Sequence, residues 1–362
     1  MKKISNLEIS SLVVIITVTM YAGINIDLIK EVTNTNGWIA VIISNIIGLL
    51  PLLIYLYIAN YKPSIPINKK INELFKKGSI IINSLICIIL LFIGITILYN
   101  TNNFITTQLL YRTPHIVIAI LLVLIASYHV SKGINSITRV SIIMLTFNII
   151  LSSLGFFSLI PEINIENFMP ILKIDTNNII PSAIKLASIN SLPIILVSII
   201  PKEDSLKPNK YNKSIIIAYL IGALISLSII IETYGILGIH LVKIFEYPEY
   251  IVYKKIVLLG FLERVENIIS SQWIIGNYIY LTLIIYYISN TINLKHKKSN
   301  LITSLLIGTI IIIIKLTIFN NNIIFYNYIK NIFAYICMSL FIIYIIIAIK
   351  IFIDKKRNKS ND

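Results

Sequence analysis

Two short segments combine helix-breaking residues with polar side chains inside otherwise apolar runs. They are Met20-Tyr21-Ala22-Gly23-Ile24-Asn25 and Ser188-Ile189-Asn190-Ser191-Leu192-Pro193. Glycine frees the backbone, and proline removes a helical hydrogen bond. Within lipid, a broken helix is tolerated only where it is buried in protein or lines a cavity, and its exposed half-helix ends suit charged groups. The segments therefore favour binding of a small ion such as an amino acid, although plain kinks in spanning helices remain an open interpretation.

Few ionisable residues lie inside the apolar runs. Glu232, followed by Tyr234, lies deepest and is the best candidate for a buried carboxylate with a structural or coupling role. Asp27, Lys185 and Lys315 lie near the ends of their runs. We expect these three side chains to reach the membrane interface.

A charged group, Glu263-Arg264-Val265-Glu266, opens a later apolar run. Glu263 and Glu266 are three residues apart and share a helix face, whereas Arg264 projects elsewhere. The group predicts a structural or coupling role, such as a salt bridge between helices. The alternative is that the acids mark the membrane interface, where the dipole of the helix N-terminus favours them.

The sequence contains no pattern typical of an enzyme or a metal centre. HExxH, CxxC, Walker, GxGxxG and GxSxG patterns are absent. The histidines do not pair at metal-ligand spacing, and Cys87 and Cys337 lie in apolar runs, where cysteine behaves as a small hydrophobic residue. We therefore expect no catalysis, no cofactor and no metal.

The composition predicts an all-α polytopic membrane protein. Hydrophobic residues make up 57% and charged residues 13% of the 362 positions, whereas a soluble domain carries about 25% charged residues. A spanning helix needs about 20 mostly apolar residues. That length predicts one transmembrane domain over residues 1–362, with a tail at 354–362 and spans at 8–29, 38–60, 79–100, 115–130, 140–160, 181–200, 213–238, 263–289, 300–319 and 331–353.

Positive charge predicts the orientation of these spans. Of the 31 Lys and Arg residues, 21 fall in segments on the side of the N-terminus and nine on the other side. Because Lys and Arg are enriched in cytoplasmic loops, both termini are expected in the cytoplasm. We expect the net charge of +15 to contact lipid headgroups and not nucleic acid. No convincing cleavage site follows the first run, which is therefore expected to be an uncleaved span.

Ten spans divide into two halves of five, at about 8–160 and 181–353. Many secondary transporters consist of two such halves in inverted orientation, each opened by a discontinuous helix. The two helix-breaking segments fall in the first and sixth spans, as that architecture requires. We therefore predict a 5+5 inverted repeat with helices 1 and 6 broken.

The stretch from Tyr247-Pro248 through Leu262-Glu263-Arg264-Val265-Glu266 to Trp273-Ile274-Ile275 resembles the B subunit of bacterial spore germinant receptors. Weaker matches in the same order extend the resemblance over nearly the whole chain: Gly37-Trp38, Thr113-Pro114, Gly133 through Arg139, and Pro170-Ile171-Leu172. That family belongs to the amino acid–polyamine–organocation transporters. The resemblance implies a leucine-transporter-like fold and a receptor that senses nutrients in the spore inner membrane, together with an A subunit and a lipoprotein C subunit.

The resemblance also implies a ligand site at the breaks of spans one and six, flanked by spans three and eight. The chain departs from the family pattern because no proline follows Gly23 within span one and no acid lies near Pro193. These departures predict either a pocket with a different ligand preference or a degenerate pocket that senses no ligand. The residues expected to line it are Tyr21, Ala22, Gly23, Ile24, Asn190, Ser191 and Leu192, with Ser270 and Ser271 as weaker candidates.

Three functions remain open at this point. The leading hypothesis is a sensor that binds a small germinant, an amino acid, near mid-membrane and signals to partner subunits. The second is an amino acid transporter driven by H⁺ or Na⁺, with Glu232 as the first candidate for the proton carrier. The third is a structural subunit that anchors a receptor complex in the lipid bilayer.

Overall fold

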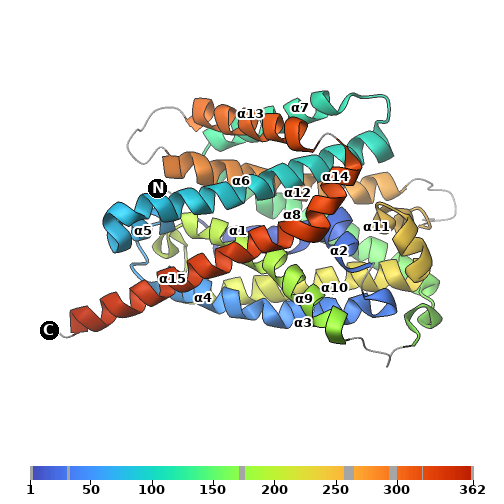
Figure 1. Cartoon of the computed structure of the whole chain (residues 1–362), viewed down its shortest axis with the longest axis horizontal. Helices are drawn as coiled ribbons and strands as arrows, with labels where there is room; N and C mark the ends of the chain where they lie inside the picture. The colour runs from blue at the N-terminus through green and yellow to red at the C-terminus, as the bar shows by residue number, and fades with distance from the viewer. Residues whose placement is uncertain are drawn as a thin grey trace.

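The computed structural model describes residues 3–30, 33–170, 176–256, 265–292, 300–319 and 321–359, and it is built almost entirely of helices (Figure 1). Nine helices in these ranges are long and apolar enough to cross a membrane. A shorter apolar helix, α7 (His115–Ser131), stands where the short fourth span was predicted. The chain is therefore a multi-pass membrane protein, as its composition predicted.

The remaining helices follow the predicted spans closely. The first span contains α1 and α2, the second α3 and α4, and the sixth α9 followed by a 3₁₀ helix. Two short helices, α5 and α11, lie in connections. The bounds are α1 (Asn6–Thr19), α2 (Ile26–Lys30), α3 (Gly37–Ile47), α4 (Leu49–Asn60), α5 (Ile67–Phe75), α6 (Ser79–Phe104), α8 (Ile134–Leu159), α9 (Thr176–Ser191), α10 (Tyr211–Ile244), α11 (Pro248–Tyr253), α12 (Val265–Ile292), α13 (Asn300–Ile318), α14 (Asn322–Tyr328) and α15 (Ala334–Lys359).

The last helix is longer than the sequence predicted. A π-helical turn, Ile329–Phe333, joins α14 to α15, so the helical path begins well before the predicted start at residue 331. α15 also continues to Lys359, which makes most of the predicted tail helical. Lysine and arginine are good helix formers, so the charged end of this segment supports the extra turns.

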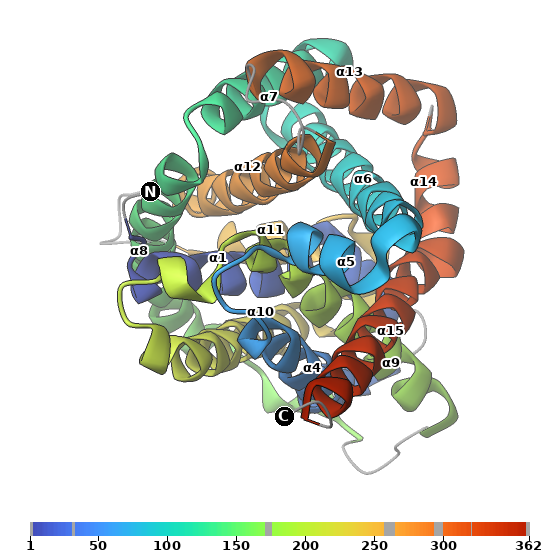
Figure 2. The ribbon, with the colours of Figure 1, turned by 90° about the vertical axis from the view of Figure 1, so that its left-hand side faces the viewer.

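Helix α1 lies inside the bundle, with α8, α10 and α12 around it (Figure 2). Its apolar residues cover all faces, as expected of a helix buried on every side. A capping box fixes its start, because the Ser5 hydroxyl accepts from the Leu7 N–H at 3.3 Å and Glu8 Oε2 accepts from the Ser5 N–H at 3.0 Å. Helices α7 and α13 form an outer layer over α6 and α12 (Figure 2).

Both predicted helix breaks are present. In the first span, α1 gives way to a π-helical turn, Tyr21–Asn25, in which Gly23 has a φ of +74°. In the sixth span, α9 passes at Ser191 into the 3₁₀ helix Leu192–Ile199, with Pro193 near its start. The inverted relation of the two halves stays a prediction.

The two ends of the chain lie at the same end of the bundle (Figure 1). There the backbone of Ile4 pairs with the segment after the sixth span. The Ile4 N–H donates to the Asp204 backbone carbonyl at 2.9 Å, and the Ile4 carbonyl accepts from the Leu206 N–H at 2.8 Å. The short helices α2, α11 and α14 lie toward the opposite end (Figure 1). We call these the terminal end and the distal end.

Candidate ligand site

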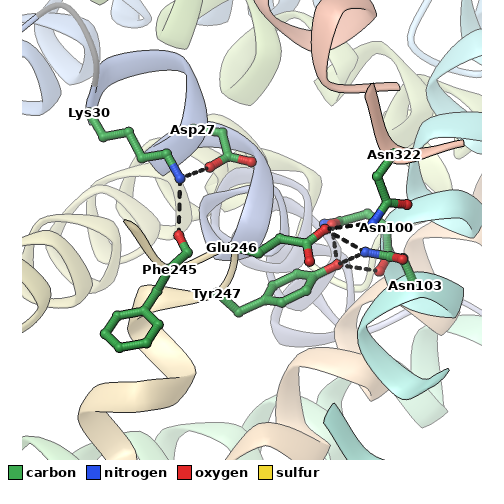
Figure 3. Close-up of polar contacts among 8 residues, drawn as sticks. All are labelled: Asp27, Lys30, Asn100, Asn103, Phe245, Glu246, Tyr247 and Asn322. Atoms are coloured by element: carbon green, nitrogen blue, oxygen red, sulfur yellow. Dashed lines mark hydrogen bonds and ion pairs between the residues drawn. The ribbon is translucent and has the colours of Figure 1, made fainter. Parts of the chain in front are cut away.

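A cavity of about 390 Å³ opens at the distal end beside the break of the first span. We call it the polar cavity, because acids, lysines and amides line it from α2, α6, α10, α14 and the segment between α10 and α11; Figure 3 shows all of these groups except the lysine of α10. Its apolar wall comes mainly from α14 and the end of α10. The polar lining consists of Gly23, Asp27, Lys30, Asn100, Asn103, Lys243, Glu246, Tyr247 and Asn322.

Helix α2 contributes an ion pair to the polar cavity. Asp27 and Lys30 are three residues apart and lie on one helix face, with 2.6 Å between Asp27 Oδ1 and Lys30 Nζ. Lys30 Nζ also donates to the Phe245 carbonyl at 3.0 Å (Figure 3). Asp27 is thereby linked through Lys30 to the segment that follows α10, and its expected position at the membrane interface stays a prediction.

Helix α6 contributes two amides, Asn100 and Asn103, which share a face. Asn103 Nδ2 donates to Glu246 Oε1 at 2.7 Å and to the Tyr247 hydroxyl at 2.9 Å. The Tyr247 hydroxyl donates to Asn100 Oδ1 at 3.4 Å, and Asn322 Nδ2 reaches Glu246 Oε1 at 3.5 Å (Figure 3). Glu246 and Tyr247 thereby join α6 and α14 across the cavity.

Gly23 places the backbone of the broken helix directly on this network. A Cβ atom at this position would lie 2.7 Å from Tyr247 Cε1 and 2.8 Å from Asn100 Oδ1. The positive φ adds a second requirement, because L-residues adopt it only with strain. Glycine is therefore required both by the backbone conformation and by the close approach of two cavity-lining side chains.

The two breaks are connected by one buried hydrogen bond, in which Asn25 Nδ2 donates to Asn190 Oδ1 at 2.8 Å. Both amides are essentially inaccessible to solvent, and Asn25 Oδ1 and Asn190 Nδ2 have no partner among the described residues. The hydroxyl of Tyr21 faces Asn190 together with Ser44 and Ser226. Asn25 was not among the predicted site residues, although it is the polar residue that ends the first helix-breaking segment.

The other predicted residues of the two breaks lie behind the cavity. Tyr21, Ile24, Ser191 and Leu192 are buried, and the Leu192 carbonyl accepts from the Tyr344 hydroxyl at 2.9 Å. Ala22 belongs to the π-helical turn. Within the described chain, Gly23 is the predicted residue that reaches the polar cavity.

Ser270 and Ser271 do not reach the polar cavity either. Ser270 lines a separate, mostly apolar groove between α1, α8, α10, α11 and α12, which we call the lateral groove. Ser271 Oγ donates to the Ile268 carbonyl of its own helix at 2.6 Å. At the same groove, Trp273 Nε1 donates to the Thr19 carbonyl at 3.0 Å and the Phe104 ring meets the indole edge-on.

The predicted coupling residues are spread over the molecule. Glu232 is buried within α10 and Glu266 is buried in the first turn of α12. Glu263 and Arg264 lie outside the described residues. The charged block that carried the family resemblance therefore adds no contact to the polar cavity within the described chain.

A further carboxyl group, which was not among the predicted site residues, approaches Gly23 from the side of the lateral groove. Glu249 on α11 is 7% exposed and lines the lateral groove. Burial raises the pKa of its carboxyl to about 8; the negative charge of Asp27 adds to this, while Lys30 and the backbone N–H of Gly23 oppose it. The first break is thus flanked by Tyr247 on one side and by Glu249 on the other.

The terminal end holds a second cavity of about 360 Å³, where the 3₁₀ helix of the sixth span ends. Asn68, Asp204 and Asn290 contribute polar groups to it. Neither this cavity nor the polar cavity offers a metal centre, since the described residues contain no group of three His, Cys, Asp or Glu side chains able to hold an ion.

Comparison with known proteins identifies the family. Residues 3–324 match the model of the family described as spore germination protein. The chain is 24% identical to spore germination protein XB of Bacillus anthracis, covering 76% of this chain and 77% of that protein. It is 28% identical to the putative spore germination protein YfkT of Bacillus subtilis strain 168, covering 57% of each. The family is of a permease or receptor type and is not an enzyme family. The resemblance to germinant receptor B subunits is confirmed, and the chain belongs to the spore germination protein family.

Proposed function

We propose that this chain is the nutrient-sensing membrane subunit of a spore germinant receptor and that an amino acid germinant binds in the polar cavity. The observation that carries the proposal is the convergence of both signs of charge on the backbone break at Gly23. A zwitterion needs an acceptor for its ammonium and a cation for its carboxylate. The cavity supplies Glu246 for the first and Lys243 for the second.

The size and openness of the cavity suit such a ligand. Its volume of about 390 Å³ falls within the range of small-molecule sites. Glu246 is exposed, so it can exchange its amide partners for a ligand ammonium. The charges of Asp27 and Lys30 are largely buried and already neutralise each other, so we propose that this pair fixes the position of α2 and does not bind the ligand directly.

The signal would pass from the first break to the second. A ligand that contacts Gly23 acts two residues from Asn25, whose amide holds Asn190 in the sixth span. Binding can shift the arrangement of the two broken helices only through a difference in affinity between the two arrangements. The receptor's A subunit and lipoprotein C subunit, in the spore inner membrane, would receive that shift, with both termini of this chain in the cytoplasm.

Transport is the second candidate function, and the cavity at the terminal end favours it. The two broken helices lie between that cavity and the polar cavity, as alternating access to one site requires. An H⁺- or Na⁺-coupled amino acid transporter would accumulate labelled amino acid in proteoliposomes that contain this chain alone. Uptake that is abolished by Glu232→Gln would support transport with a proton carrier.

Germination of deletion-mutant spores on a nutrient panel tests the sensing proposal. We expect the deletion to abolish the response to one amino acid or a small related set, and the intact gene to restore it. The same purified chain in nanodiscs should then bind that amino acid. Unchanged responses to every nutrient in a strain without redundant receptors would contradict the proposal.

A further inference from the structure

Lys315 is a buried cation with no carboxylate paired to it among the residues that the structure describes. It lies near the distal end of α13, and its side chain is 5% exposed. In the described part of the chain, no carboxylate pairs with its ammonium and no acceptor hydrogen-bonds to it; the Tyr99 ring face lies 5.4 Å away. The sequence predicted a side chain that reaches the membrane interface, but the structure turns it into the protein.

The ammonium borders a cavity of about 250 Å³ between α6, α7, α13 and α14. We call it the Lys315 cavity. The amides of Asn103, Asn321 and Asn322 and the imidazole of His115 line it, and the amide nitrogens of Asn103 and Asn322 donate to Glu246. None of the described residues that line it is acidic.

An unpaired ammonium inside a membrane protein is costly, and such groups normally pair with an anion or face a polar pathway. The stacking of the Lys315 cation over Tyr99 offsets only a small part of that cost. Amide and imidazole donors beside a lysine match the several acceptor oxygens of a phosphate. We propose that the Lys315 cavity is a binding site for a phosphate group, which pairs with Lys315.

The site is adjacent to the polar cavity and shares two side chains with it, Asn103 and Asn322. Asn322 Oδ1 accepts from the Tyr99 hydroxyl at 2.7 Å, and its Nδ2 reaches Glu246. An anion on Lys315 competes for these amide donors and so loosens their hold on Glu246. Occupancy of one cavity therefore changes the other, whichever ligand the polar cavity takes.

Two sources can supply the anion, and one experiment distinguishes them. The purified full chain is placed in phosphatidylcholine nanodiscs, and its thermal unfolding is measured after adding phosphatidylglycerol or inorganic phosphate. We expect one of the two probes to raise the unfolding midpoint by a few degrees. A lipid phosphate is the occupant if phosphatidylglycerol acts, and a free anion is the occupant if inorganic phosphate acts in the neutral bilayer.

Lys315→Met should lose this increase while Lys315→Arg keeps most of it. The matched control is Lys185→Met, because Lys185 also lies over a tyrosine ring, Tyr335 at 5.5 Å, but is only half-buried and borders none of the described cavities. The increase should survive in that control. The proposal is overturned if neither probe stabilises the unmodified chain, or if Lys315→Met responds as fully as the Lys185→Met control.

Discussion

The two broken helices differ in how they use their breaks. The first break is a π-helical turn with a positive φ at Gly23, and Gly23 lines the polar cavity. The second is a 3₁₀ helix in which every residue from Leu192 to Ile199 is buried. Both breaks keep backbone hydrogen bonds, and in the first the Asn25 N–H donates to the Met20 carbonyl at 3.0 Å, so the breaks differ in the side chains beside them and not in unsatisfied backbone groups. A ligand in the polar cavity therefore contacts the first break directly and reaches the second through Asn25 and Asn190.

Gly23→Ala should have the largest effect, because it forces a Cβ into Tyr247 and Asn100. We expect the nutrient response to fall about 100-fold or more, while the amount of protein in spore membranes stays unchanged. The response is measured as the germination rate against nutrient concentration.

Gly133→Ala is the matched control. Gly133 also has a positive φ, +83°, but nothing lies within 4 Å of an added Cβ. The Gly133→Ala variant should be destabilised only by the backbone strain of the positive φ, about 1–2 kcal/mol, and spores that carry it should respond normally to nutrient. If both variants respond alike, the close packing at Gly23 is not what the site depends on.

Glu249 makes the first break sensitive to pH. Its carboxyl, with a pKa raised from 4.5 to about 8, binds a proton more tightly in the folded chain than in the unfolded one. The folded state is therefore favoured at low pH, and its stability falls as pH rises between about 4.5 and 8. Glu249→Gln should remove this decline, so the variant gains stability over the unmodified chain as pH rises from 5 to 8. Equal pH profiles by thermal unfolding in nanodiscs would argue against a raised pKa.

Glu246→Gln should weaken ammonium binding in the polar cavity by about tenfold, or about 1.4 kcal/mol, since the charge is lost but the hydrogen-bond acceptor remains. Glu203→Gln, at an exposed position near the terminal end, is the control and should bind normally. Calorimetry with the amino acid identified by the nutrient panel measures both. Unchanged affinity of Glu246→Gln would remove Glu246 from the binding site.

The hydrogen bond between the breaks should show a smaller coupling. Asn25→Ala or Asn190→Ala leaves the other amide unpaired in the interior, at a cost of about 1–3 kcal/mol. The double variant should cost less than the sum of the two by about 1 kcal/mol. Unfolding measurements on the four proteins give this coupling, and strict additivity would mean that the breaks are energetically independent.

Most of the fold was predictable, because apolar length and helix-breaking residues are local signals. The positions of the spans and of both breaks follow from such signals. The face of α12 that points inward was not predictable, because this helix is apolar on all faces and its sequence does not distinguish them. Ser270 lines the lateral groove and Ser271 bonds its own helix, so neither borders the polar cavity, and their predicted role in ligand binding stays a prediction.

The polar cavity was only partly predictable. Gly23 was identified from its type and position, but the residues around it come from segments far apart in the chain. Asn103, Glu246 and Asn322 meet only when α6, the segment between α10 and α11, and α14 pack together. The sequence shows polar residues on apolar helices, and it shows Tyr247 in the stretch that resembles the family. Local sequence does not indicate that these residues share one cavity.

The most direct test of the central claim is protection of the polar cavity by nutrient. Ile323 lines the cavity, is 73% exposed and makes no side-chain hydrogen bond, so Ile323→Cys in a chain with Cys87 and Cys337 replaced gives one reporter thiol. Ile165→Cys, 69% exposed and outside the cavity, is the control. We predict that the germinant slows maleimide labelling at position 323 but not at 165, and that Gly23→Ala abolishes the protection. Equal labelling rates at position 323 with and without germinant would contradict binding in this cavity.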